Sequence, residues 1–203
     1  MDYATFRTEL KEHLNRRDCT DSRADSFVDK AFLRINRVLD HNVREAIHFY
    51  TVAENDGESA IPLPLDAGKK IIEVSVGGVP VEVYPDRLGT QNVYLGYTRR
   101  GTGILFNQNL PLGTQITIVY WRNFARPPLL TETNDLLKQM NPLVLYAALA
   151  EAGMFFAHDR TAEWSGTFDR LLLEAIGEYQ DRELSGYGGS MVVQAPTAGS
   201  TDY

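Results

Sequence analysis

The sequence predicts an α+β fold: an antiparallel bundle of two N-terminal and two C-terminal helices, an inserted small antiparallel β region, and an extended C-terminal tail. Three observations predict it. Apolar residues recur at three- and four-residue steps near both ends of the chain, and they alternate in the middle. From residue 185 onward the composition changes to Gly, Ser, Thr and other small residues, which is typical of a tail without a core of its own.

The composition sets the domain organisation that we expect. The chain has 203 residues, 43% of them hydrophobic, which suffices for one domain or for two small ones that share a core. We expect four parts, in this order: an N-terminal helical pair at 1–45, the inserted β region at 46–124, a C-terminal helical hairpin completing the bundle at 125–184, and a Gly-rich C-terminal arm at 185–203.

Two amphipathic helices are predicted before residue 45. Asp2 can cap the first, in which Phe6, Leu10 and Leu14 line one side at four-residue spacing. Caps for the second helix are offered by Thr20, Asp21 and Ser22. Its apolar face is formed by Ala24, Phe27, Val28, Ala31, Phe32, Ile35, Val38 and Leu39, and basic residues mixed with Asp29 occupy the other side.

The middle of the chain reads as short strands. They are expected at 47–52, 71–76, 79–83, 92–95, 102–106 and 114–121. Asn55-Asp56-Gly57 is a turn, and Gly77-Gly78 is a strong two-residue hairpin signal. The segment 61–65 is held extended by two prolines, so it is unsuited to a central strand.

The segment 141–157 should be the helix around which the bundle is organised. We expect Asn141 to cap it and Pro142 to occupy its first turn. Glu151 is its only charge and no polar stripe runs along it, so protein should surround it, and it is too short to span a membrane. The segment 161–184 carries one apolar face and should form a helical hairpin with it, turning at residues 158–160.

The charge distribution limits the classes of partner. A net charge of -7 and a pI of about 5.1 argue against a dedicated nucleic-acid binder, which needs clustered Lys and Arg. The acidity lies in 151–184, where three basic residues stand against eight acidic ones. Two interpretations stay open: a solvated helix face, or a surface that repels DNA or docks on a basic partner.

No pattern of catalytic, metal or cofactor residues is found. His13, His41, His48 and His158 are scattered without ligand spacing, and no nucleotide-binding or hydrolase motif occurs. Cys19 is the only cysteine, which excludes an internal disulfide, and no histidine close in sequence is placed to activate it. We therefore expect no enzyme, no metal and no cofactor. With no signal peptide visible, we expect synthesis inside the cell.

Several segments taken together resemble the head-to-tail adaptor, or connector, proteins of tailed bacteriophages, which form a ring beneath the portal. The resemblance covers roughly residues 32–173, and the order and spacing of the segments match. The segments are F-L-R-I-N-R-V-L at 32–39, I-P-L-P at 61–64, I-I-E-V-S-V at 71–76, I-T-I-V-Y-W at 116–121, P-P-L at 127–129, N-P-L-V-L-Y-A-A-L-A-E-A at 141–152 and D-R-T-A-E-W at 159–164.

This resemblance implies a structural virion protein of the neck and tail region, assembled in the host cytoplasm. It implies a homo-oligomeric ring of about twelve copies that binds the portal protein and extends the DNA channel. Such a ring offers a platform to tail or nozzle proteins. DNA would pass through the channel without sequence-specific binding, and no membrane would be involved.

The resemblance also assigns roles to two groups of residues. The arm would reach into the portal or a neighbouring subunit through five apolar anchors, Tyr187, Met191, Val192, Val193 and Tyr203. The alternative for the arm is a loose chain end without a role. Three acids, Glu174, Glu178 and Asp181, would face the channel and repel DNA, or would meet a basic surface of the tail or portal if they face outward.

Two other functions stay open at this point. One is a different virion or packaging component that contacts DNA directly, for which a steep salt dependence of DNA binding would be the sign. The other is a small enzyme whose acid pair is assembled only in three dimensions, for which a deep pocket with perturbed carboxylates would be the sign.

Overall fold

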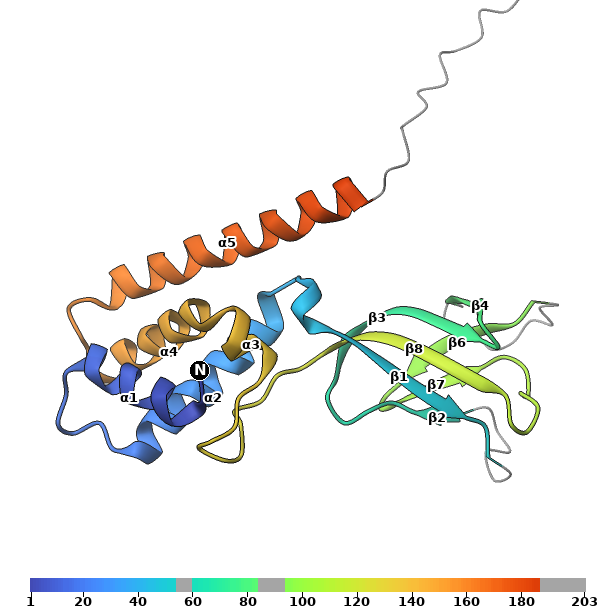
Figure 1. Ribbon diagram of the computed structural model, residues 1–203, viewed down its shortest axis with the longest axis horizontal. Helices are drawn as coiled ribbons and strands as arrows, with labels where there is room; N and C mark the ends of the chain where they lie inside the picture. Colours follow the sequence, from blue (N-terminus) through green and yellow to red (C-terminus); the bar gives the residue numbers. More distant parts are fainter. Residues whose placement is uncertain (54–59, 84–93, 187–203) are drawn as a thin grey trace, which may run out of the picture.

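The computed structural model describes residues 1–53, 60–83 and 94–186, which form a helical module and a β module side by side along one long axis (Figure 1). The chain starts in the helical module, crosses once into the β module and returns to finish the helices. The helices are α1 (Tyr3–Leu14), α2 (Asp21–Val38), α3 (Asp135–Gln139), α4 (Asn141–Phe156) and α5 (Thr161–Gly186).

The helix starts follow local capping chemistry at two of the predicted positions. The Asp2 carboxylate accepts a hydrogen bond from the backbone N–H of Thr5, and the Thr20 hydroxyl accepts one from that of Arg23, so both predicted caps are confirmed. The prediction that Asn141 caps α4 is wrong. Met140 occupies the cap position and Asn141 is already helical, because α3 ends one residue earlier and its own cap leads the chain directly into α4.

Helix α4 lies at the centre of the helical core. Its residues between Leu143 and Ala152 are buried except Tyr146 and Glu151, which are half-buried, and α1, α2 and α5 supply the surrounding side chains. Trp164 and Phe168 of α5 and Phe32 of α2 are fully buried in this core, and each contributes about 1.5–3 kcal/mol of hydrophobic stabilisation. At the last turn of α4, Met154 and Phe155 are exposed, so the cover ends before the helix does.

Two four-stranded sheets form the β module, and their orders are β1-β8-β3-β4 and β2-β7-β6-β5. A short 3-10 turn, η1 (Asn42–Arg44), leads into the first strand. The strands are β1 (Glu45–Thr51), β2 (Ala60–Pro62), β3 (Ala67–Val76), β4 (Val79–Pro80), β5 (Glu82–Val83), β6 (Gly96–Arg100), β7 (Gly103–Phe106) and β8 (Gln115–Arg122).

The sheets correct the predicted fold class. The β part is not a small antiparallel region inserted in a helical bundle, because the two sheets enclose a hydrophobic core of their own, separate from the helical one. Ile118 and Val74 from one sheet meet Ile104 and Phe106 from the other in this core. Strand β5 pairs with β6 in parallel, so the region is not wholly antiparallel either. The sequence did not reveal this core, because no single strand adds more than three buried apolar side chains to it.

Local turn chemistry explains two features of the sheets. Gly77 and Gly78 both have positive φ, and they join β3 to β4 as the hairpin that the sequence predicts. Strand β2, which contains Pro62, lies at an edge of its sheet, where a missing N–H donor is tolerated.

Candidate functional site

The two modules meet at a joint built around Arg44, at the end of η1. Its guanidinium donates three hydrogen bonds: from Nη1 to the Leu39 carbonyl at 2.8 Å, from Nε to the Arg122 carbonyl at 3.2 Å, and from Nη2 to Asn123 Oδ1 at 3.2 Å. Leu39 directly follows α2. Arg122 is the last residue of β8, and Asn123 comes directly after it. One side chain therefore connects the last turn of a helix to the end of a central strand.

Arg44 is 3% exposed, an unusual degree of burial for a cation. Burial lowers the pKa of its guanidinium, and the charge of Asp40 acts against that shift. Backbone carbonyls and the face of Trp121, 5.3 Å from the guanidinium carbon, compensate the charge in place of a carboxylate. A buried cation held in this way fixes geometry, because its Nε, Nη1 and Nη2 atoms each donate to a partner at a set position.

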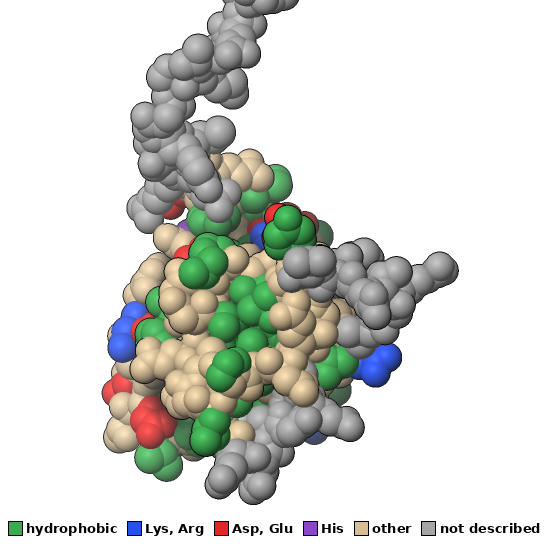
Figure 2. All heavy atoms as spheres, turned by 90° about the vertical axis from the view of Figure 1, so that its right-hand side faces the viewer, with side chains coloured by type: hydrophobic (Ala, Val, Ile, Leu, Met, Phe, Trp, Pro, Cys, Tyr) green, Lys and Arg blue, Asp and Glu red, His purple; other side chains and the backbone are tan. Residues whose placement is uncertain are grey.

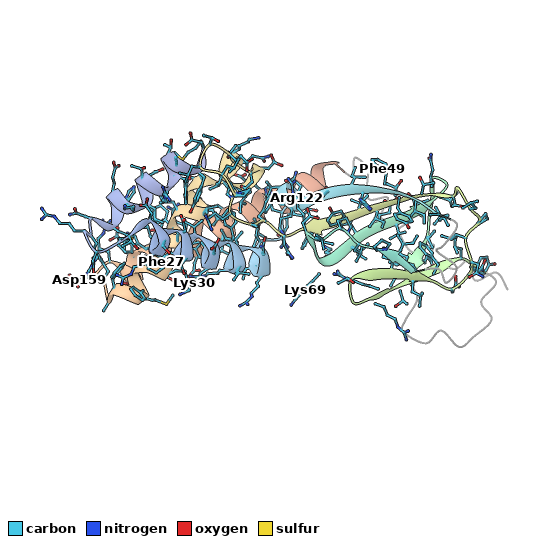
Figure 3. All side chains as sticks on the ribbon, turned by 90° about the horizontal axis from the view of Figure 1, so that it is seen from below. Phe27, Lys30, Phe49, Lys69, Arg122 and Asp159 are labelled. Carbon is cyan, nitrogen blue, oxygen red and sulfur yellow. The ribbon has the colours of Figure 1, made fainter. Side chains whose placement is uncertain are left out.

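Asn36 of α2 makes a second connection across the joint. Its amide donates to the Phe124 carbonyl at 2.8 Å and accepts from the Phe124 N–H at 2.9 Å, so α2 pairs with the segment that leaves β8. Arg122 lies between the modules (Figure 3) and forms an ion pair with Asp135 at the start of α3. The hydrogen bond from Arg122 lowers the pKa of the Asp135 carboxyl.

The C-terminal half of α5 runs over this joint. The Tyr179 hydroxyl lies 3.4 Å from Glu45 Oε1 at the start of β1, and the Tyr179 ring lies 5.8 Å from the ring of His41. The helix therefore contacts both modules, and its last turn points beyond the helical core (Figure 1). The joint is held by η1, β8 and α5 together, so the two modules form one body.

Of the predicted site residues, the structure describes the side chains of Glu174 and Glu178, which lie one turn apart on α5. Glu174 and Glu178 are exposed on α5, and Glu174 pairs with Arg170 at 2.7 Å. Asp181 belongs to α5, but its side chain is outside the described part. The predicted arm anchors Tyr187, Met191, Val192, Val193 and Tyr203 all lie outside the described residues. These predictions therefore stay predictions.

The described residues were also compared with the requirements of a reactive cysteine, a metal site and a membrane-spanning helix. Cys19 is buried, and burial raises the pKa of its thiol, which lowers its reactivity at neutral pH. Within residues 1–53, 60–83 and 94–186, no three His, Cys, Asp or Glu side chains are placed to hold a metal ion. None of the helices in those ranges combines the length and the apolar character that a membrane crossing requires.

The described surface has grooves along both modules. Two adjoining grooves follow α2 and the joint, and Leu33 and Arg37 line both. A third, apolar groove lies at the end of the β module far from the helices, between Val79 and Tyr94. Figure 2 looks onto that end and shows hydrophobic side chains gathered near the middle of the face.

Sequence reasoning missed the residues that hold the joint. Arg44 and Asn36 contact groups about eighty residues away, between Arg122 and Phe124, and no local pattern encodes such a pairing. The one available signal is the position of Arg44, where helical periodicity gives way to strand periodicity. An arginine there reads equally well as a solvated loop residue.

Comparison with known proteins gives one result that bears on identity. A family model described as SU10 adaptor protein matches residues 1–194, which is nearly the whole chain. No curated protein matches the chain. The match includes both modules and the joint between them, so it concerns the complete described fold. The chain therefore belongs to the SU10 adaptor family, a family of bacteriophage head-to-tail adaptor proteins.

Proposed function

We propose that this protein binds the portal ring of a tailed phage, assembles there as a ring, extends the DNA channel and offers a platform to tail proteins. The observation that carries the proposal is the family match over residues 1–194. The build of the chain supports it. Two cores joined by buried polar contacts give a body of fixed shape. A protein that holds one ring in position on the next requires such a body.

The C-terminal arm supplies the contact with the portal or with a neighbouring subunit. It begins after α5, whose last described residue is Gly186, and α5 itself is anchored at the joint through Tyr179. Tyr187, Met191, Val192, Val193 and Tyr203 are its apolar anchors. Each anchor binds weakly, and the symmetry of the ring multiplies that weak contact by the number of copies.

The acids of α5 face the DNA channel in this proposal. Glu174 and Glu178 are exposed, and Asp181 continues the series toward the arm. A wall of carboxylates repels the phosphate backbone over about 8 Å at physiological salt, so DNA slides through without binding. The exposure of the two described acids is compatible with this role.

The far end of the β module is the platform for tail proteins in this proposal. Val79 and Leu112 are each 66% exposed there, and the apolar groove beside Val79 adds to this surface. Exposed apolar side chains in one area are typical of surfaces that other proteins cover. The described end of helix α5 lies over the joint and not at that far end of the β module (Figure 1).

Co-sedimentation with the purified portal ring tests the proposal. The chain should travel with the portal, and the complex should contain several copies of the chain per ring. Adding an unrelated ring-shaped protein in place of the portal gives the control. Failure of the intact chain to travel with its own portal would reject the proposed function.

A further inference from the structure

The outer side of the sheet β1-β8-β3-β4 exposes large apolar side chains. In that sheet, Val74 and Ile118 point into the core between the two sheets, so their neighbours along β3 and β8 point outward. Strand β1 follows the same alternation, and its outward residues Ile47 and Phe49 are 60% and 74% exposed. Figure 3 shows Phe49 at the border of the β module.

This apolar area extends over three neighbouring strands. In the register of the sheet, Val119 of β8 lies between Ile47 of β1 and Glu73 of β3. The register shifts between Ile71 and Glu73, and Ile72, which is 41% exposed, lies beside Glu73 on the outer side because Ile71 packs toward the core. We call Ile47, Phe49, Ile72 and Val119 the outer apolar face. Exposed apolar side chains gathered in this way are typical of a surface that another segment or chain covers.

The end of the sheet near the joint is already covered on this side. There Glu45 and Trp121 are register partners on the outer side of β1 and β8. The Tyr179 hydroxyl of α5 contacts Glu45 Oε1, and Lys70 Nζ lies 4.0 Å from the centre of the Trp121 ring. The outer apolar face begins two residues further along β1, at Ile47, so it lies directly beyond the contact with α5.

Helix α5 leads the rest of the chain toward this side of the sheet. Both α5 and β1 run from the helical module toward the β module (Figure 1). Gly186, the last residue of α5, comes seven residues after Tyr179, which is about 10 Å along the helix axis. Residues 187–203 span up to about 56 Å when extended, at about 3.3 Å per residue. They therefore begin on the side of the outer apolar face and are long enough to cover it.

The sequence of the arm matches the chemistry of this face. Met191, Val192 and Val193 are consecutive apolar residues, and Asp202 is the only charged side chain of residues 187–203. A neutral segment with an apolar centre can bury the exposed side chains of the sheet without leaving a charge unpaired. A nucleic acid fits the face poorly, because its phosphates would meet the carboxylate of Glu73 at the border.

We propose that, in the free chain, the arm of each copy packs on the outer apolar face of the same copy through Met191, Val192 and Val193. The tether favours this occupant over a second copy. A segment joined to its site by a short stretch of the same chain acts at about millimolar effective concentration, far above that of another copy in dilute solution. The inference concerns the free chain, so it goes beyond the proposed function, in which the arm is released and the same anchors bind the portal or a neighbouring subunit.

Cross-linking between two introduced cysteines tests this contact in the free chain. In a Cys19→Ala background, one variant has Glu73→Cys beside the face and Gln194→Cys after the anchors. The control has Asp40→Cys with Gln194→Cys, because Asp40 is exposed next to the joint contact of α5 but lies outside the sheet. A short bis-maleimide reagent should join residues 73 and 194 about tenfold faster than residues 40 and 194, since docking raises the local concentration of residue 194 at the face.

Two further substitutions show whether apolar contact holds the arm in place. Adding Ile47→Ser to the variant with cysteines at 73 and 194 should lower its cross-linking rate about tenfold, because losing one large apolar contact changes a binding equilibrium by about that factor. Leu129→Ser is the matched control and should leave the rate unchanged. Leu129 is 58% exposed and lies in the helical module, directly before Leu130, whose carbonyl accepts from the N–H of Ala4. Circular dichroism and thermal unfolding show that each variant retains the fold.

The cross-linked product identifies what covers the face. A product within one chain, formed at a rate that does not depend on protein concentration, supports the proposal. A product between chains shows that a second copy covers the face, and this overturns the proposal. Equal rates at residues 40 and 73, or a rate that Ile47→Ser does not lower, show that the arm does not bind there and overturn it as well. The portal is absent from these measurements, so their failure leaves the proposed function standing.

Discussion

The guanidinium of Arg44 lies 5.3 Å from the centre of the Trp121 ring, and both side chains are almost fully buried at the boundary between the helical and β modules. The same guanidinium holds the end of α2 and the end of β8 by hydrogen bonds. One cation thus connects the two modules, beside the contacts of Asn36 and Tyr179, and this makes the joint open to direct tests.

Replacing Arg44 by methionine should destabilise the protein. The substitution keeps an apolar stem but leaves the carbonyls of Leu39 and Arg122 without their donor, and each buried acceptor left unpaired costs about 1–3 kcal/mol. Denaturant unfolding measures the loss. Arg100→Met, at an exposed position, is the matched control and should have little effect. A variant at Arg44 as stable as the wild type would show that the joint does not depend on this side chain.

Two glycine substitutions should change the free energy of unfolding in opposite directions. A methyl group at Gly68 would overlap the Trp121 carbonyl and crowd the Arg44 guanidinium, so Gly68→Ala should cost about 1–3 kcal/mol. Gly166 lies inside α5 with open space around it, so Gly166→Ala should add up to about 1 kcal/mol of helix stability. Thermal unfolding of both variants provides the comparison, and a stabilising change at residue 68 would contradict the close contact.

The stability of the protein should fall at high pH partly because of Tyr120. Burial first, and then the hydrogen bond to Asp66, raises the pKa of Tyr120 to about 12 from a usual value of 10.0. Because the pKa of Tyr120 is higher in the folded than in the unfolded protein, the protonated side chain stabilises the fold. This contribution to the free energy of unfolding is complete below the unfolded pKa and is lost as pH rises from 10.0 to about 12. Tyr120→Phe should flatten the fall of unfolding free energy over that range, and an unchanged profile would refute this cause.

Some features of this fold were predictable because they are local. The caps at Asp2 and Thr20 and the Gly77-Gly78 hairpin depend on a few neighbouring residues, so the sequence alone contains the information. The cap at Asn141 was mispredicted because α3, directly before it, takes the chain into a helix one residue early.

Pairing between strands that are distant in sequence could not be predicted from local patterns. The β module is larger than its strands suggest, because β2 and β5 join a second sheet through partners distant in sequence. The same limit applies to the surface. The basic side of α2 was interpreted as a solvated face, and only the fold shows that Leu33 and Arg37 on it border two adjoining grooves.

Removing residues 187–203 should leave the fold intact and weaken portal binding. The segment is rich in Gly, Ser and Thr and has few large apolar side chains, so thermal unfolding should change little. The fraction of chain that sediments with the portal should fall, because the apolar anchors are gone. A variant that keeps the arm but replaces Val192 and Val193 by serine separates the anchors from mere length. Unchanged binding by both variants would exclude the arm as the contact.

The most direct test of the central claim is electron microscopy of the purified portal with and without this chain. The account predicts a second ring stacked coaxially on the portal, continuing its channel, that appears only when the chain is added. Portal particles that look the same with and without the chain, or chain bound as scattered single copies, would contradict it.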